Sequence, residues 1–159
     1  MRGRVTAQSP VMKQFLAPFA LVLTLAILAG CATDKSGLSG FKAELLKIER
    51  DGHGAATATW QIVNPNVATY NVAESSHKIF VNGRYLGRAV TKEPTGVPRQ
   101  TNVTQSAPIA MERDGAAILD AAGNSGAYRI ESSLLLLIYS TTTEKFSVTN
   151  AGTVRITGK

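Results

Sequence analysis

Few side chains in this sequence have types and spacings that could do chemistry. Its 159 residues include a single cysteine, Cys31, and two histidines, His53 and His77. The histidines and Glu74 are a conceivable metal site, but their spacing is not typical of zinc ligands. The serines and threonines form no nucleophile elbow, and no pair of carboxylates stands out as an acid and a base. We therefore expect no enzymatic activity, no metal and no cofactor.

The cysteine follows a segment with the properties of a signal peptide. Residues 1–30 contain basic side chains and no acidic one, and the stretch 15–30 is almost entirely apolar or small. Such a stretch is short for a bilayer span and typical of a signal peptide. It ends in Leu28, Ala29, Gly30 and Cys31, which together resemble the lipobox of bacterial lipoproteins. The resemblance implies cleavage before Cys31 and a diacylglycerol on its thiol. A short membrane anchor with an incidental cysteine is the alternative.

A lipid on Cys31 has consequences for compartment and partners. Diacylglycerol and an amide-linked chain together supply more than one acyl chain, as stable membrane anchoring requires. In the Gram-negative lipoproteins that this segment resembles, an Asp directly after the cysteine acts as a signal for retention in the inner membrane. Because Ala32 stands there, we expect the outer membrane, facing the periplasm. Cleavage removes three of seventeen basic residues and none of eleven acidic ones, leaving a net charge of +3. A charge that small, in the cell envelope, argues against a nucleic-acid partner.

The rest of the chain has the pattern of one all-β domain, residues 41–159, preceded by a polar tether at residues 31–40. Short runs alternate apolar and polar residues and end at turn residues. One face of the second run is apolar, and Pro65 ends that run because it lacks an N–H for the ladder. The expected strands are 41–50, 56–64, 77–81, 84–91, 101–111, 128–139 and 146–157.

Turn residues and one alanine-rich stretch complete the pattern. Asn82-Gly83 between two runs is a strong hairpin signal, and Gly83 suits the positive φ of such a turn. Residues 114–122 predict one short helix, with Asp114 at its start and Gly123-Asn124 at its end. Asn150-Ala151-Gly152 predicts a bend or a bulge in the last strand. About seven strands at this spacing favour a β-sandwich.

Several short motifs also follow one another in a particular order. They are Ile62-Val63-Asn64-Pro65-Asn66, Tyr70-Asn71-Val72, Ile79-Phe80-Val81-Asn82-Gly83, Leu86-Gly87 and Val97-Pro98, followed by a helix and two strands. This order resembles the late embryogenesis abundant (LEA) type 2 family, also called the water stress and hypersensitive response (WHy) domain, over about residues 41–157. The resemblance implies an immunoglobulin- or fibronectin-III-like sandwich of about seven strands, no enzymatic activity, and an association with desiccation and other stress.

The Asn64-Pro65-Asn66 motif has a physical interpretation of its own. Strand parity places Asn64 on the same side as Trp60 and Ile62, toward the core. A buried amide is costly unless it is hydrogen-bonded. We expect the Asn64 side chain to bind backbone groups freed where Pro65 ends the strand, and Asn66 to form an Asx-type turn. On this interpretation the motif is a structural corner rather than a binding site.

The run from Leu134 to Tyr139 is apolar on both faces of its predicted strand. The even-numbered positions belong in the core, so Leu135, Leu137 and Tyr139 point outward. Either the helix at 114–122, a loop or strand curvature covers them, or they form an exposed patch for a client, a partner lipoprotein or the membrane.

Two functions from different classes fit these observations. The first is a lipid-tethered, non-enzymatic module that protects envelope proteins or membrane during water loss, with a hydrated surface rich in Thr, Ser and Asn. The second is an accessory subunit that docks one envelope assembly through a strand edge or the Leu135 face. The resemblance favours the first function.

Overall fold

The computed structural model describes residues 40–138 and 142–158, all of which belong to one compact unit, Ser36–Lys159. The predicted signal peptide, the lipobox, Cys31, Ala32, nearly all of the tether and Tyr139 lie outside the described residues. Within the described ranges, no helix is long and apolar enough to span a bilayer.

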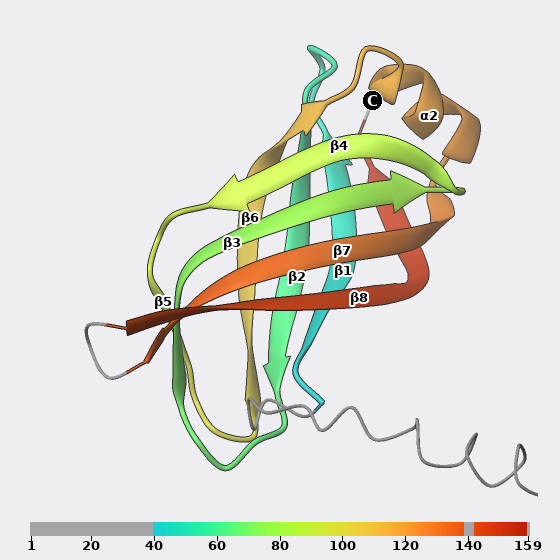
Figure 1. Ribbon diagram of the computed structural model, residues 1–159. Helices are drawn as coiled ribbons and strands as arrows, with labels where there is room; N and C mark the ends of the chain where they lie inside the picture. The colour runs from blue at the N-terminus through green and yellow to red at the C-terminus, as the bar shows by residue number, and fades with distance from the viewer. Residues whose placement is uncertain (1–39, 139–141, 159) are drawn as a thin grey trace, which may run out of the picture. The chain divides into compact units, whose positions relative to one another are not determined.

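Eight strands and one short helix make up the described part of this unit, which confirms the predicted all-β class (Figure 1). Several features were not predicted: the strand that contains His77 begins seven residues earlier, the last two strands begin three and four residues earlier, and a further short strand follows the fourth. The elements are β1 (Lys42–Arg50), β2 (Ala56–Asn64), β3 (Tyr70–Val81), β4 (Arg84–Thr91), β5 (Thr95–Val97), β6 (Thr101–Met111), α2 (Gly115–Ala122), β7 (Ser125–Ile138) and β8 (Thr142–Thr157).

The strands form one continuous sheet that closes on itself, not two separate sheets. Their order is β4-β6-β2-β1-β8-β7-β3, and a β3–β4 pairing completes the ring, with β5 added outside it along β3. The domain is therefore a closed barrel of seven strands, and the predicted immunoglobulin- or fibronectin-like sandwich is replaced by it. The physical reason is β4, which pairs with β3 on one side and with β6 on the other. Inward- and outward-facing side chains alternate along a strand in the same way in a barrel and in a sandwich, so the sequence pattern does not distinguish the two.

Alternating side chains fill the interior of the barrel. Ala56, Ala58, Trp60 and Ile62 are all buried along β2, as the sequence pattern predicts. On β7, Tyr128, Ile130, Leu134 and Leu136 are buried too. Helix α2 covers the upper end of the barrel in Figure 1 and buries Ile118 and Leu119. Asp120 on the helix pairs with Arg50 at 2.7 Å. The predicted capping residue Asp114 makes no side-chain cap hydrogen bond, because its carboxylate pairs with Arg84 instead.

The seam between β1 and β8 is short. These strands run parallel and pair only over Lys47–Glu49 and Arg155–Thr157, so among the described strands β7 alone pairs with residues 142–154 of β8. An aromatic cluster lies beside β1 and β8. The ring of Phe41 packs edge-on against the rings of Tyr70 and Phe146, with 5.8 Å between the ring centroids in each pair. The β7–β8 register is unbroken through residues 150–152, so the bulge considered there is absent, although β8 turns sharply in Figure 1.

Candidate functional site

The Asn64 corner lies at the lower end of the barrel in Figure 1, where β2 gives way to the loop leading to β3. Asn64 is fully buried, and its Nδ2 donates to the carbonyl oxygens of Ala68 (2.8 Å), Val97 (3.3 Å) and Pro98 (2.9 Å). The side chain thus satisfies the backbone of two chain segments at once. The Asx-type turn predicted for Asn66 is formed by Asn64 instead, because Oδ1 of Asn64 accepts from the N–H of Asn66 at 3.0 Å.

Replacing Asn64 by alanine is expected to lower the free energy of unfolding by about 2–3 kcal/mol, because three carbonyls and one N–H lose their partner. Urea denaturation measures the change. Asn66→Ala is the matched control, since the Nδ2 of Asn66 is buried without a partner among the described residues. A urea denaturation curve of the Asn64 variant that coincides with that of wild type would refute the structural role of the Asn64 side chain.

The Asn82-Gly83 turn lies at the other end of the barrel and joins β3 to β4. Both residues have positive φ, 49° and 79°, as a two-residue hairpin of this type requires. Oδ1 of Asn82 accepts from the N–H of Ala127 at 2.9 Å, which ties the turn to the start of β7. The turn therefore fixes the hairpin and the neighbouring strand together.

A hollow of about 700 Å³ lies on the outer face of β3, β7 and β8. We call it the serine groove, because Ser76, Ser133 and Ser147 face one another across the three strands. Acidic and basic side chains border this serine row, and no large aromatic ring is among the lining residues. They are Glu74, Ser76, Lys78, Arg88, Glu131, Ser132, Ser133, Leu135, Lys145, Ser147, Val148 and Thr149.

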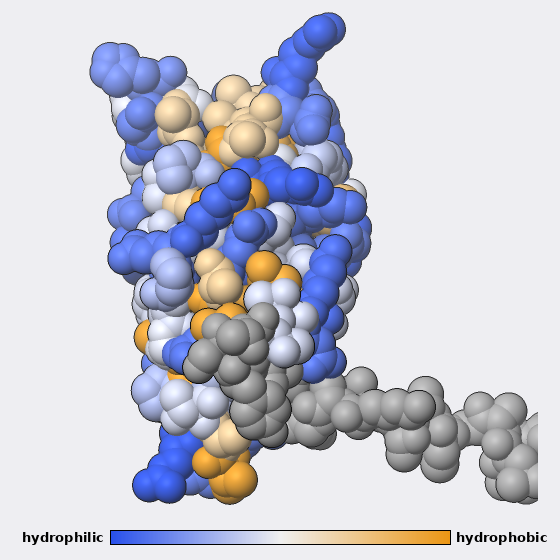
Figure 2. Space-filling model, turned by 60° about the vertical axis from the view of Figure 1, so that its left-hand side comes forward, coloured by the Kyte–Doolittle hydropathy of each residue, from blue (hydrophilic) through white to orange (hydrophobic). Residues whose placement is uncertain are grey.

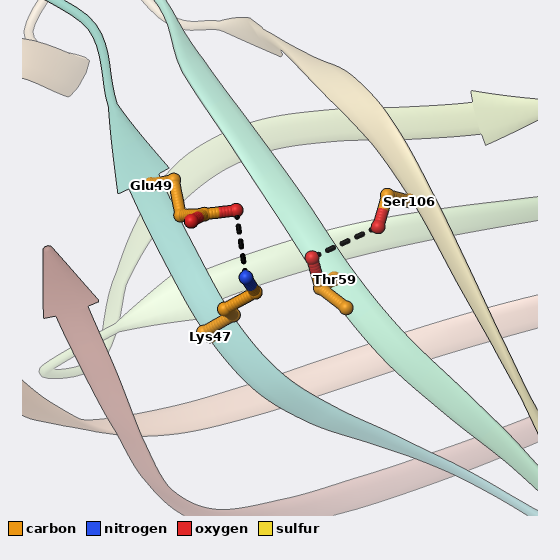
Figure 3. A network of polar contacts seen from close by, with 4 residues as sticks. All are labelled: Lys47, Glu49, Thr59 and Ser106. Carbon is orange, nitrogen blue, oxygen red and sulfur yellow. Dashed lines mark hydrogen bonds and ion pairs between the residues drawn. The ribbon is translucent and has the colours of Figure 1, made fainter.

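A second hydroxyl-lined hollow, of about 630 Å³, lies on the outer face of β1, β2, β6 and β8. Within it, Oγ1 of Thr59 and Oγ of Ser106 lie 2.9 Å apart, and Lys47 pairs with Glu49 at 3.0 Å (Figure 3). Both hollows therefore present hydroxyl groups alongside charges of both signs.

The apolar run on β7 borders the serine groove. Leu135 and Leu137 are half-buried, and Leu135 lies between Glu74 of β3 and Lys145 of β8 in the cross-strand row. The helix does not cover them, because α2 contacts β3 and β4 rather than the outer face of β7. Among the described residues, the large hydrophobic side chains with the greatest exposure lie elsewhere, at Leu46, Val67 and Val90.

A polar cluster inside the barrel was missed by sequence reasoning. His77 is fully buried; its Nδ1 lies 2.8 Å from Oγ of Ser132, and its ring lies 4.2 Å from that of Trp60. Its Nε2 has no partner among the described residues. Burial lowers the pKa of His77 to about 4, so the imidazole is neutral near pH 7. Gln105 extends the cluster by accepting from the indole N–H of Trp60 and from Ser75.

The two histidines are not brought together. His53 is exposed on the turn after β1, whereas His77 is inside the barrel, and Glu74 faces outward in the serine groove. In residues 40–138 and 142–158, no three His, Cys, Asp or Glu side chains are grouped so that they could hold a metal ion.

Comparison with known proteins identifies a shared fold. No model of a known protein family matches the chain, and no curated protein matches it. The solution structure of AT1g01470 from Arabidopsis thaliana has a TM-score of 0.50 at 16% identity, over 74% of this chain and 80% of that one. This likeness shows the fold alone.

Two further solved structures are less similar. A protein from Archaeoglobus fulgidus has a TM-score of 0.40 at 15% identity, over 73% of this chain and 94% of that one. A protein provisionally described as late embryogenesis abundant (LEA), At2g46140.1, has a TM-score of 0.46 at 10% identity, over 87% of this chain and 86% of that one. Neither likeness is strong enough to support an argument.

Proposed function

We propose that this protein is a bacterial lipoprotein of the LEA type 2 (WHy) kind, which protects envelope proteins or membrane during water loss without catalysing a reaction. The observation that carries the proposal is the row of serine hydroxyls in the serine groove, with charges of both signs around it. The ordered motifs from Ile62 to Pro98 and the fold shared with AT1g01470 are compatible with it.

The chemistry of this surface suits a protectant. A hydroxyl group both donates and accepts hydrogen bonds, so a row of them can bind polar groups of either kind. Such a surface can replace some of the hydrogen bonds that neighbouring proteins or lipid headgroups lose when water is withdrawn. Charges of both signs let the same face meet acidic and basic surfaces, which is appropriate for many unrelated clients.

The serine row is tested by removing its hydroxyls. The soluble domain (residues 32–159) and its S76A/S133A/S147A variant are dried with labile enzymes, and the recovered activity is measured. The matched control replaces three exposed hydroxyls outside the hollows, those of Ser125, Thr142 and Thr157, by alanine or valine. We expect the serine-row variant to lose most of the protection and the control to keep it. Equal protection by all three proteins would show that the groove is not the protective surface.

The membrane anchor is proposed at Cys31, in the outer membrane and facing the periplasm because Ala32 follows it. Replacing Cys31 by serine is expected to move the protein from the membrane fraction to the soluble fraction, because the acyl chains supply the binding free energy. Mass spectrometry of the N-terminal peptide measures the lipid directly. An unmodified Cys31 in membrane-bound wild-type protein would exclude the lipoprotein assignment.

A second function, docking to one envelope assembly, is favoured by a different observation. Residues 142–154 of β8 pair only with β7 within the described chain, and a strand edge of this kind can add a strand from another protein. One stoichiometric partner recovered by crosslinking from intact cells, and lost when a proline replaces Thr149, would favour the accessory-subunit function.

A further inference from the structure

The end of the barrel where β2 ends and β1 begins, at the bottom of Figure 1, has an exposed apolar residue and exposed basic residues. Val67, in the loop between β2 and β3, has 78% of its surface exposed, against 41% for Leu46 and 37% for Val90. Lys42 at the start of β1 and Arg99 before β6 are both exposed. Residues 40–43, 63–71 and 97–102, which lie at this end, contain no acidic residue; Glu44 follows on β1, and Glu144 of β8 is in the same cross-strand row as Val72. We call these three segments the Val67 end.

The exposed loop is held in place from inside. The amide of Asn64 binds the carbonyls of Ala68 and Pro98, and the N–H of Gln100 donates to the carbonyl of Asn66 at 3.0 Å. The loop bearing Val67 and the segment bearing Arg99 are therefore fixed to each other. An apolar side chain on a loop that is already fixed loses little conformational entropy when it is buried against another surface. In Figure 2, the lowest part of the molecule shows apolar atoms beside strongly hydrophilic ones.

The chain reaches the domain at this same end. A methyl group on Gly40 would lie 3.0 Å from Cγ of the Pro65 ring, next to the Val67 loop. Eight residues separate Cys31 from Gly40, and the nine Cα–Cα steps between them span about 30 Å when fully extended. The opposite end, with α2 and the Asn82-Gly83 turn, is farther from that connection (Figure 1). A lipid on Cys31 would thus hold the Val67 end close to the bilayer.

We propose that the Val67 end is a membrane-docking surface, whose occupant is the phospholipid headgroup layer holding the Cys31 lipid. This inference rests on the proposed lipid anchor. Val67 enters the boundary between headgroups and acyl chains, and Lys42 and Arg99 lie beside the phosphates of anionic lipids. Each contact is weak alone, but the tether raises the effective concentration of the domain at the surface, so weak contacts suffice. Docking in this way orients the barrel with α2 away from the membrane.

The orientation is tested with the lipidated, full mature chain in vesicles of phosphatidylethanolamine and phosphatidylglycerol. A fluorophore is attached to Val67→Cys or, as the matched control at the opposite end, to Ala121→Cys, which is an exposed position on α2. Acylation blocks Cys31, so only the introduced thiol reacts. We expect iodide quenching at position 67 to be at least about threefold weaker than at position 121, and a quencher in the lipid to act at position 67 alone. Adding K42E and R99E should restore iodide quenching at position 67.

Equal iodide quenching at the two positions, in protein that floats with the vesicles, would overturn the docking proposal and leave the anchor intact. Protein that does not float with the vesicles would instead refute the anchor, and the docking proposal would fall with it. Flotation and quenching on the same sample therefore separate the two failures.

Discussion

Replacing Gly87 by alanine is expected to lower the free energy of unfolding by about 4 kcal/mol, or to prevent folding altogether. Gly87 has a φ of +153° on β4, and a Cβ there would stand 2.3 Å from the carbonyl oxygen of Ala110. The neighbouring atoms are backbone of β6 and cannot move aside without breaking the ladder. Gly87 pairs with Ile79 of β3 and with Met111 of β6, so it lies where the barrel closes.

The matched control is Gly52→Ala. Gly52 lies on the turn after β1, and nothing approaches its added Cβ within 4 Å. Urea denaturation followed by circular dichroism should leave this variant within about 0.5 kcal/mol of wild type. If the Gly87 and Gly52 variants were equally stable, β4 would not need a glycine to bridge β3 and β6, and the closed ring of strands would be in doubt.

Acidification is expected to remove about 3 kcal/mol of stability through His77 alone. The pKa of His77 is lowered to about 4 by burial, against an ordinary value of 6.5. Between these values the unfolded chain binds a proton that the folded chain excludes. The contribution of His77 is therefore fully present above about pH 6.5, and it is lost as the pH falls toward 4.

The measurement compares wild type with His77→Gln from pH 7.5 to pH 4, because glutamine can hydrogen-bond to Ser132 but does not titrate. The carboxylates contribute equally to both proteins, so the difference in unfolding free energy isolates the histidine. A difference between wild type and His77→Gln that does not change with pH would contradict a buried, neutral His77.

Local features of the fold could be predicted from the sequence, and its closure could not. Alternation located β2, β4 and β6, and the Asn82-Gly83 turn located the hairpin of β3 and β4. Closure depends on which strands meet at their edges, and β4 shows the same alternation whether it pairs with one neighbour or two. Gly87 was one local signal of closure, since a glycine inside a strand often marks a close backbone approach.

The local features of the candidate site could also be predicted from the sequence, whereas its long-range contacts could not. Strand parity was enough to predict where the Asn64 side chain would lie, but its partners at Val97 and Pro98 are more than thirty residues away in the sequence. The sequence pattern places His77 at the start of a strand, and its parity with the core residues Ile79 and Val81 predicts a position inside the barrel. The serine groove could not be foreseen, because its three serines come from strands whose neighbours were unknown.

The most direct test of the proposed protective function dries or freeze-thaws the soluble domain, residues 32–159, with several unrelated labile enzymes. An unrelated β-sheet protein of equal size and charge, at the same concentration, serves as the control. We predict that recovered enzyme activity is clearly above that of the control for every enzyme tested. Recovery no better than the control would contradict a general protectant and turn the search to a specific envelope partner, beginning at the free edge of β8.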